Sequence, residues 1–261
     1  MASDNVAVYT VQSHFGSHCI GTRFKKCLPA IIGPGQEGFV DGRYMGEVTR
    51  LLYDTIYDAY STKGKSGVIM SIDFEKAFDS VSFSFMEKVI ETAGFPKILQ
   101  TWVKILLKGF RSHINHAGNL LKLIELGRGA RQGDPIASIL FVLAIEILLI
   151  AIRNNQKIEP YRYEMLSAMD KPISNKVGAY ADDVNIMMPR SEASIRETIL
   201  TLDRFEKLAG LRVNKDKTQM LRIGKGATSA PILCEDLGLK WVTRMKICLL
   251  YTSDAADEIV R

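Results

Sequence analysis

The sequence predicts an α+β domain in which an antiparallel sheet packs on helices. Residues 191–209 carry apolar side chains at helical spacing, whereas 111–127 and 176–188 each follow a strand, turn and strand pattern. The chain of 261 residues is 47% hydrophobic and 24% charged, which is typical of a globular protein with a substantial core. The length fits one large domain or two small ones.

The first part of the chain predicts two helices. Residues 1–20 show no clear period, so we assign them no structure. The following segment TRFKKCLPAII predicts a short basic helix that ends near Pro29. The segment GEVTRLLYDTIYDAY predicts an amphipathic helix. The apolar stripe of this second helix is Val48, Leu51, Leu52, Ile56 and Ala59.

A short apolar strand, SGVIMSID, is expected to end at Asp73. Ser84 and Glu87 fit a capping box for a helix, and a second helix is expected after Pro96. The residues 111–127 then predict a β-hairpin.

The most apolar segment, PIASILFVLAIEILLIAI, has a composition that a membrane span could share. It contains Glu146, is short for a bilayer and leads into a polar segment, so we expect a buried core helix over 136–153. The second hairpin follows, and then an amphipathic helix with Ser191 as its N-cap and Gly210 just past its end. The segment KTQMLRIG predicts one more strand.

Carboxylates gather at two points of this pattern. Asp73 ends an apolar strand, and Asp182 and Asp183 occupy a hairpin turn. If strand 67–73 lies beside strand 176–181, these side chains meet at one sheet edge. Their repulsion would need a cation, and Mg²⁺ prefers oxygen ligands. Two such ions stabilise the attacking and leaving oxygens of phosphoryl transfer. The alternative is a solvated turn, because aspartate is a common turn residue.

Six motifs follow one another along the chain. They are LPAIIGPGQEGFVDGR, SIDFEKAFDSV, GRGARQGDPIASILFVLAIEIL, AYADDV, AGLRVNKDKTQML and LGLKWV. Together they resemble the catalytic core of reverse transcriptases of the non-LTR (LINE-type) retrotransposon class. The resemblance runs from about residue 21 to 247.

The resemblance implies a right-hand polymerase fold with a palm and partial fingers, and with the thumb missing. The implied divisions are 1–20 unassigned, disordered or misassembled; 21–65 partial fingers; 66–81 palm; 82–126 connection between fingers and palm; 127–247 palm; and 248–261 an artefactual tail. The stretch from Cys248 to Glu258 resembles a translated sequencing adapter, and a short amphipathic tail is the alternative.

The resemblance also assigns catalytic roles. Asp73 and Asp182 match the two metal-chelating aspartates, and Asp183 matches the adjacent auxiliary carboxylate. The implied cofactor is Mg²⁺, as two ions, with Mn²⁺ as a substitute. Lys217 matches a proton donor to the leaving pyrophosphate. The other interpretation of Lys217 is a surface lysine in a basic stretch.

A nucleotide site is implied beside these carboxylates. Phe78 matches the aromatic ring under the sugar of the incoming nucleotide, where a bulky ring excludes a 2′ hydroxyl. Ordinary core packing is the alternative for Phe78. Gln132 and Gly133 match the turn that approaches the nucleotide, and Gly133 allows close backbone approach. Phe74 and Arg43 complete the expected nucleotide-binding set.

Basic residues are expected to hold nucleic-acid phosphates, which dominate such affinity. They are Arg23, Lys25, Lys26, Arg128 and Arg131. For Arg128 and Arg131 a solvated surface position is the alternative. The net charge of +5 is compatible with a polyanionic partner.

The resemblance implies an RNA-directed DNA polymerase that binds an RNA template, a DNA primer and deoxynucleoside triphosphates. We expect this chain to be a fragment with weak activity or none. The alternative is a non-catalytic, maturase-like RNA-binding module. A metal-dependent nuclease would explain the carboxylates but neither Phe78 nor the Gln132–Pro135 turn.

Location and assembly follow from weaker signals. The first residues lack the pattern of a signal peptide, and the four cysteines form no C-x-x-C pair. We therefore expect reduced thiols and an intracellular protein, in cytoplasm and nucleus, without a membrane partner. The sequence leaves the oligomeric state open.

Overall fold

The computed structural model describes residues 11–107, 111–116, 119–125, 127–129, 134–164, 174–225, 232–247 and 250–251. The helices are α1 (Val11–Ile31), α2 (Met45–Ser61), α3 (Ala77–Ser80), α4 (Phe83–Thr92), α5 (Lys97–Leu107), α6 (Pro135–Asn154) and α7 (Glu192–Ala209), with the 3-10 helix η3 (Glu235–Leu237). The strands are β1 (Gly67–Ile72), β2 (Arg111–His116), β3 (Asn119–Glu125), β4 (Tyr161–Arg162), β5 (Ser174–Asn175), β6 (Val177–Tyr180), β7 (Asp183–Pro189), β8 (Gln219–Ile223), β9 (Lys240–Val242), β10 (Lys246–Ile247) and β11 (Leu250–Tyr251). The mixture of helices and strands is the predicted one, and both expected hairpins are present.

Within the described residues, five strands form the central sheet in the order β6-β7-β1-β8-β9. Two expectations about this sheet are wrong. β1 lies beside β7 rather than β6, and the sheet is mixed, because β8 and β9 pair in parallel. β7 is buried along most of its length, which suits an interior position. The long connection through η3 lets the chain return to the same end of the sheet, as a parallel pair requires.

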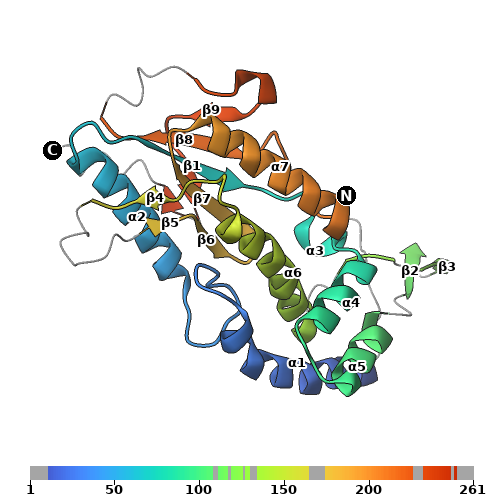
Figure 1. Ribbon diagram of the computed structural model, residues 1–261. Helices are drawn as coiled ribbons and strands as arrows, with labels where there is room; N and C mark the ends of the chain where they lie inside the picture. Colours follow the sequence, from blue (N-terminus) through green and yellow to red (C-terminus); the bar gives the residue numbers. More distant parts are fainter. Residues whose placement is uncertain are drawn as a thin grey trace.

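Helices cover both faces of this sheet, with α6 and α7 on one side and α2 on the other (Figure 1). The alternation along β1 explains the two layers. Val68 and Met70 belong to the core that includes α6, whereas Ile69 packs with Val48 of α2. Apolar residues on both faces therefore fix β1 in the middle of the domain. The carboxyl end of β1 lies where the strands of the sheet end, not at an edge strand.

Two helix starts differ from those expected. α1 begins at Val11, so residues 11–20 are helical, and the helix continues past Pro29 to Ile31. Its buried stripe of Ile20, Phe24 and Leu28 packs one residue per turn into the core. This burial holds together a helix whose remaining positions are largely polar.

The helix α4 starts two residues earlier than the capping box predicts. Its N-cap is Ser82, not Ser84, and the Ser82 side chain makes no capping bond. The Ser82 and Ser84 hydroxyls bond to each other at 2.7 Å instead. The Ser82 backbone N–H donates to the Ala209 carbonyl oxygen at 2.8 Å, so a contact with the end of α7 sets the helix start.

The long apolar helix α6 is a core helix, as predicted. Among the described residues it is the one helix long and apolar enough to cross a membrane, and 72% of its most apolar window is buried inside the protein. Asp134 caps its first turn by accepting a hydrogen bond from the Ile136 backbone N–H at 3.1 Å, and Pro135 occupies the first helical position.

Candidate active site at the carboxyl end of β1

Asp73 follows the last residue of β1 and is half-buried. Its backbone is held by the loop before β8. The Asn214 N–H donates to the Asp73 carbonyl oxygen at 2.8 Å, and the Asp73 N–H donates to the Thr218 hydroxyl oxygen at 3.3 Å. These bonds fix the backbone that presents the carboxylate at the end of a central strand.

Asp182 stands in the turn of the β6–β7 hairpin, after Ala181. Because Ile72 pairs with Val184, the end of β1 lies beside the start of β7. Burial raises the pKa of the Asp182 carboxyl, its own backbone N–H lowers that pKa, and the negative charge of Asp73 raises it. The structure thus brings Asp73 and Asp182 together, as predicted, although the pairing runs through β7.

Asp183 is placed differently from its neighbour. It is the first residue of β7, it pairs with Tyr180 across the hairpin, and it is exposed. Among the described residues, no group of three or more histidine, cysteine, aspartate or glutamate side chains is arranged to hold a metal. Asp183 belongs to a strand while Asp182 belongs to the turn, so the two neighbouring carboxylates have different backbone positions. The auxiliary role of Asp183 stays a prediction.

The paired carboxylates have the chemistry of a magnesium site. No described basic side chain lowers the pKa of Asp182, which burial and Asp73 both raise. A hard cation would remove this repulsion, and Mg²⁺ is commonly held by one or two carboxylates together with substrate phosphates. Asp73 and Asp182 therefore fit the metal that the sequence predicts.

Lys217 lies in the turn that leads into β8 and is exposed. Its backbone N–H donates to the Asn214 side-chain oxygen at 3.2 Å, and Asn214 in turn bonds to Asp73. The loop of Lys217 is thus attached to the candidate site, while its side chain makes no contact that assigns it a role. The proton-donor role stays a prediction.

The two predicted phenylalanines differ in exposure. Phe74 is 7% exposed and belongs to the main core. Phe78 is half-buried in α3 and stacks on Phe141 of α6, with ring centroids 4.3 Å apart. Core packing therefore accounts for the Phe74 side chain and for one face of the Phe78 ring. The nucleotide contacts of Phe74 and Phe78 stay predictions.

Arg43 makes backbone contacts that the sequence does not predict. Its guanidinium donates to three backbone carbonyl oxygens, of Ile32, Gly33 and Gln36, at 2.7 to 2.8 Å. A planar guanidinium with five donors suits this task, and three of its five donors are used within the loop. Arg43 therefore holds the shape of the loop after α1, and its nucleotide contact stays a prediction.

The remaining predicted basic residues are distributed as follows. Arg23, Lys25 and Lys26 are exposed on α1, and Lys25 pairs with Asp41 at 2.8 Å. Arg128 is exposed beside its bridge to Ser82. The predicted residues Arg131, Gln132 and Gly133 lie outside the described residues.

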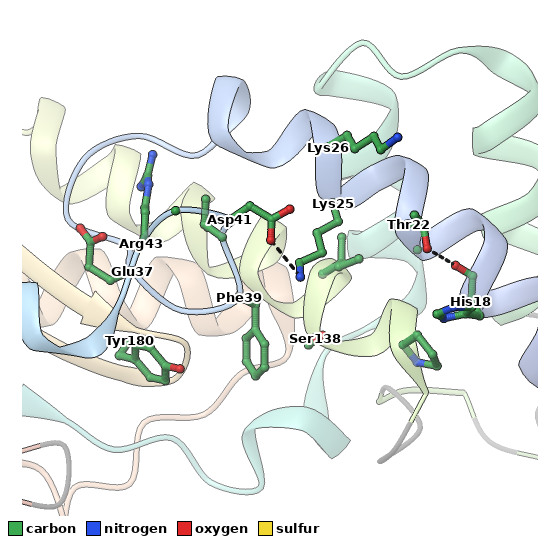
Figure 2. A pocket seen from close by; sticks show the side chains of 15 residues that line it. His18, Thr22, Lys25, Lys26, Glu37, Phe39, Asp41, Arg43, Ser138 and Tyr180 are labelled. Carbon is green, nitrogen blue, oxygen red and sulfur yellow. Dashed lines mark hydrogen bonds and ion pairs between the residues drawn. The ribbon is translucent and has the colours of Figure 1, made fainter.

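A cavity of about 720 Å³ opens next to the hairpin. It is lined by α1, the loop 37–43, the start of α6 and Tyr180. Figure 2 shows Lys25 reaching from α1 toward Asp41 on the loop. The Tyr180 ring lies near the Phe39 ring, with centroids 6.4 Å apart. The cavity thus has cationic groups on one wall and aromatic rings on another. One of these rings, Tyr180, stands two residues before Asp182 in the chain.

One residue of the site was not predicted. Gln36 is fully buried, and its side-chain amide bonds to both backbone polar groups of Ala181, next to Asp182. Sequence reasoning placed Gln36 only in a fingers segment. No signal in the sequence singled it out, because Gln36 stands between Gly35 and Glu37 and nothing in the sequence shows which distant backbone a buried glutamine meets.

Comparison with protein families gives a match over residues 17–247 to the reverse transcriptase (RNA-dependent DNA polymerase) family. Similar proteins are Pol proteins of non-LTR retrotransposons. The chain is 27% identical to the transposon TX1 uncharacterized 149 kDa protein of Xenopus laevis, over 78% of this chain and 15% of that protein. It is 25% identical to a Pol polyprotein of the type-1 element R2 of Popillia japonica, over 73% of this chain and 26% of that protein.

Solved polymerase structures share the fold. Telomerase from Candida albicans superposes with a TM-score of 0.57 at 12% identity, over 93% of this chain and 36% of that one. The RNA-dependent RNA polymerase of BmCPV gives a TM-score of 0.50 at 12% identity, over 80% of this chain and 18% of that one. The chain thus spans well under half the length of these proteins and of the retrotransposon relatives.

Proposed function

The chain belongs to the reverse transcriptase (RNA-dependent DNA polymerase) family, and we propose that it forms the palm and part of the fingers of a polymerase that copies RNA into DNA. One observation carries this proposal. Asp73 follows β1 and Asp182 stands in the β6–β7 turn beside it, and the charge of Asp73 raises the pKa of the Asp182 carboxyl. Such a pair suits a cation-dependent phosphoryl transfer.

In the proposed reaction Asp73 and Asp182 hold the metal. Mg²⁺ bound there would activate the primer 3′ hydroxyl and neutralise charge on the triphosphate as pyrophosphate leaves. The protein's own contribution is positioning. The loop 212–218 fixes Asp73 through Asn214 and Thr218, and the hairpin turn fixes Asp182.

The cavity beside the hairpin is the proposed entry for nucleic acid. Lys26 on α1 supplies positive charge, whereas Lys25 is paired with Asp41. The Tyr180 and Phe39 rings supply surfaces on which a base or sugar can stack. The half-buried Phe78 is the proposed gate against a 2′ hydroxyl. The proposed ligands are an RNA template, a DNA primer and deoxynucleoside triphosphates.

The test is nucleotide incorporation on an RNA template with a DNA primer, by a longer protein that supplies a thumb after this chain. RNA binding is measured on the same samples. Mg²⁺-dependent extension supports the proposal. RNA binding without extension overturns it and favours a non-catalytic RNA-binding module. Cleavage of the template instead of extension favours a nuclease.

A further inference from the structure

The turn that carries Asp182 contains a strained residue. Ala181 has a φ of 54°, in the left-handed region that a residue with a Cβ rarely adopts. It is the first of the two turn residues between Tyr180 and Asp183. A positive φ at this position is typical of hairpin turns that use glycine there. Some contact must therefore hold Ala181 in place.

That contact is the side chain of Gln36. Its oxygen accepts hydrogen bonds from the Ala181 N–H at 2.9 Å and from the Gly38 N–H at 2.8 Å, and its nitrogen donates to the Ala181 carbonyl oxygen at 3.2 Å. Gln36 is fully buried, so water cannot replace these bonds. One amide thus satisfies both backbone polar groups of the strained residue.

Gln36 is itself fixed along the edge of β6. The Glu37 N–H donates to the Ala179 carbonyl oxygen at 2.8 Å, and the Ala179 N–H donates to the Gly35 carbonyl oxygen at 2.5 Å. Gln36 and Ala179 form a parallel bridge. The segment 35–37 therefore lies beside β6 as a short extra strand, which aims the Gln36 side chain at the turn.

The same segment is anchored to α6 and to its own loop. Glu146 of α6 accepts a hydrogen bond from the Gly33 N–H at 3.0 Å, and Arg153 donates to the Pro34 carbonyl oxygen at 2.9 Å. Arg43 donates to the Gln36 carbonyl oxygen at 2.7 Å. A continuous set of bonds thus links the core helix to Gln36.

Close packing also requires this arrangement. A Cβ on Gly38 would come within 2.4 Å of the Ala181 nitrogen, so only glycine lets the loop approach the turn. Among other side chains, glutamate could accept both N–H bonds but could not donate to the Ala181 carbonyl, and methionine could do neither. Glutamine therefore matches the site in shape and in bonding.

We propose that Gln36 is a positioning residue for the reaction: it holds Ala181 in its left-handed conformation and so fixes Asp182 beside Asp73. This inference rests on the proposed function, in which Asp73 and Asp182 bind the metal. In this proposal Gln36, from the segment 35–37, acts through Ala181 and is not itself a ligand of the metal or of the substrate.

The test compares Gln36→Met with Gln36→Met/Ala181→Gly in the full chain. Mn²⁺ binding is measured by the electron paramagnetic resonance signal of free Mn²⁺, and hydrogen exchange of the Asp183 amide is measured without metal. We expect Gln36→Met to weaken Mn²⁺ binding about tenfold or more, as loss of a supporting partner commonly does, and to speed exchange at Asp183. Glycine at position 181 adopts a positive φ without strain, so the double variant should recover both quantities.

The matched control is Gln100→Met. Gln100 is also a buried glutamine whose amide donates to a backbone carbonyl, that of Phe95, at 2.7 Å, but it stands on α5. Its loss should lower the Tm and leave Mn²⁺ binding unchanged. The proposal is overturned if Gln36→Met binds Mn²⁺ and exchanges at Asp183 like the wild type, or if glycine at 181 restores neither.

The two proposals fail in different ways. If the wild-type chain and Asp182→Asn bind Mn²⁺ equally, the metal role is wrong. The exchange at Asp183 then still decides whether Gln36 holds the turn.

Discussion

Asp73 and Asp182 lie close enough at one edge of the sheet for the charge of Asp73 to raise the pKa of the Asp182 carboxyl. The two residues come from separate connections, one after β1 and one between β6 and β7. Burial and the charge of Asp73 both disfavour the charged form of the Asp182 carboxyl. These effects can be measured on stability as well as on activity.

Asp182→Asn should stabilise the metal-free protein at neutral pH. The pKa of Asp182 is raised in the folded state, so the group favours folding below its ordinary pKa of 3.8 and loses that contribution as pH rises through the folded pKa. We expect the Tm of Asp182→Asn to exceed that of the wild type at pH 7.5, and the difference to shrink as the pH falls toward 3. Thermal melts in EDTA check this. A gain that persists at pH 3, or a lower Tm at pH 7.5, would contradict it, and Asp203→Asn on the exposed face of α7 is the control.

Arg43→Lys should destabilise the protein even though it keeps the charge. A lysine ammonium cannot reach the three carbonyl oxygens that the Arg43 guanidinium now bonds. We expect a loss of about 2 kcal/mol in the free energy of unfolding. Urea denaturation measures it. Unchanged stability with weaker RNA binding would instead favour Arg43 as a phosphate contact.

Lys26→Ala should weaken RNA binding and leave stability unchanged. Lys26 is exposed on α1 and lines the cavity beside Tyr180. If it contacts one phosphate, the slope of log Kd against log salt should fall by about 1. Fluorescence anisotropy over a salt series measures this slope, with the exposed Lys157→Ala, outside the cavity, as control. Equal slopes for both variants and the wild type would place the RNA elsewhere.

Phe78→Val should let a polymerase that contains this chain accept ribonucleotides. The half-buried Phe78 ring is the proposed barrier to a 2′ hydroxyl, and a smaller side chain leaves room for that hydroxyl. We expect the ratio of kcat/KM for ribonucleotides over deoxynucleotides to rise about tenfold or more. Phe141→Leu serves as the control, because it removes the stacking partner of Phe78 but leaves the Phe78 ring in place. An unchanged ratio in Phe78→Val would leave Phe78 a packing residue.

The spacing of apolar residues predicted most helices and strands, because this spacing shows which face of an element is buried. Of the predicted stripe on α2, Val48, Leu52, Ile56 and Ala59 are buried and Leu51 is half-buried. β1 ends at Ile72, one residue before the predicted end at Asp73. Strand neighbours were not predictable in the same way. A period of two shows which face is buried but not which strand lies alongside, so β7 was not expected beside β1.

Side-chain roles depended even more on tertiary structure. The family resemblance indicated a nucleotide contact for Arg43, and it gave no sign that three backbone carbonyls near the end of α1 bond to the guanidinium. Gln36 gave no signal of a role, because its partner Ala181 is distant in the chain. The Asp73–Asp182 pair was predictable because each carboxylate interrupts an apolar run in a recognisable motif.

The central claim is that Asp73 and Asp182 bind the metal for nucleotide transfer. The most direct measurement is the rate of single-nucleotide incorporation against Mg²⁺ concentration, on an RNA template with a DNA primer, by the wild type and by Asp182→Asn in a protein that includes a thumb. We predict that Asp182→Asn lowers the rate at least about a hundredfold, because loss of a residue that only supports a metal ligand already costs up to about a hundredfold. RNA binding should stay within about twofold of the wild type. An Asp182→Asn protein that incorporates nucleotides at the wild-type rate would contradict the account.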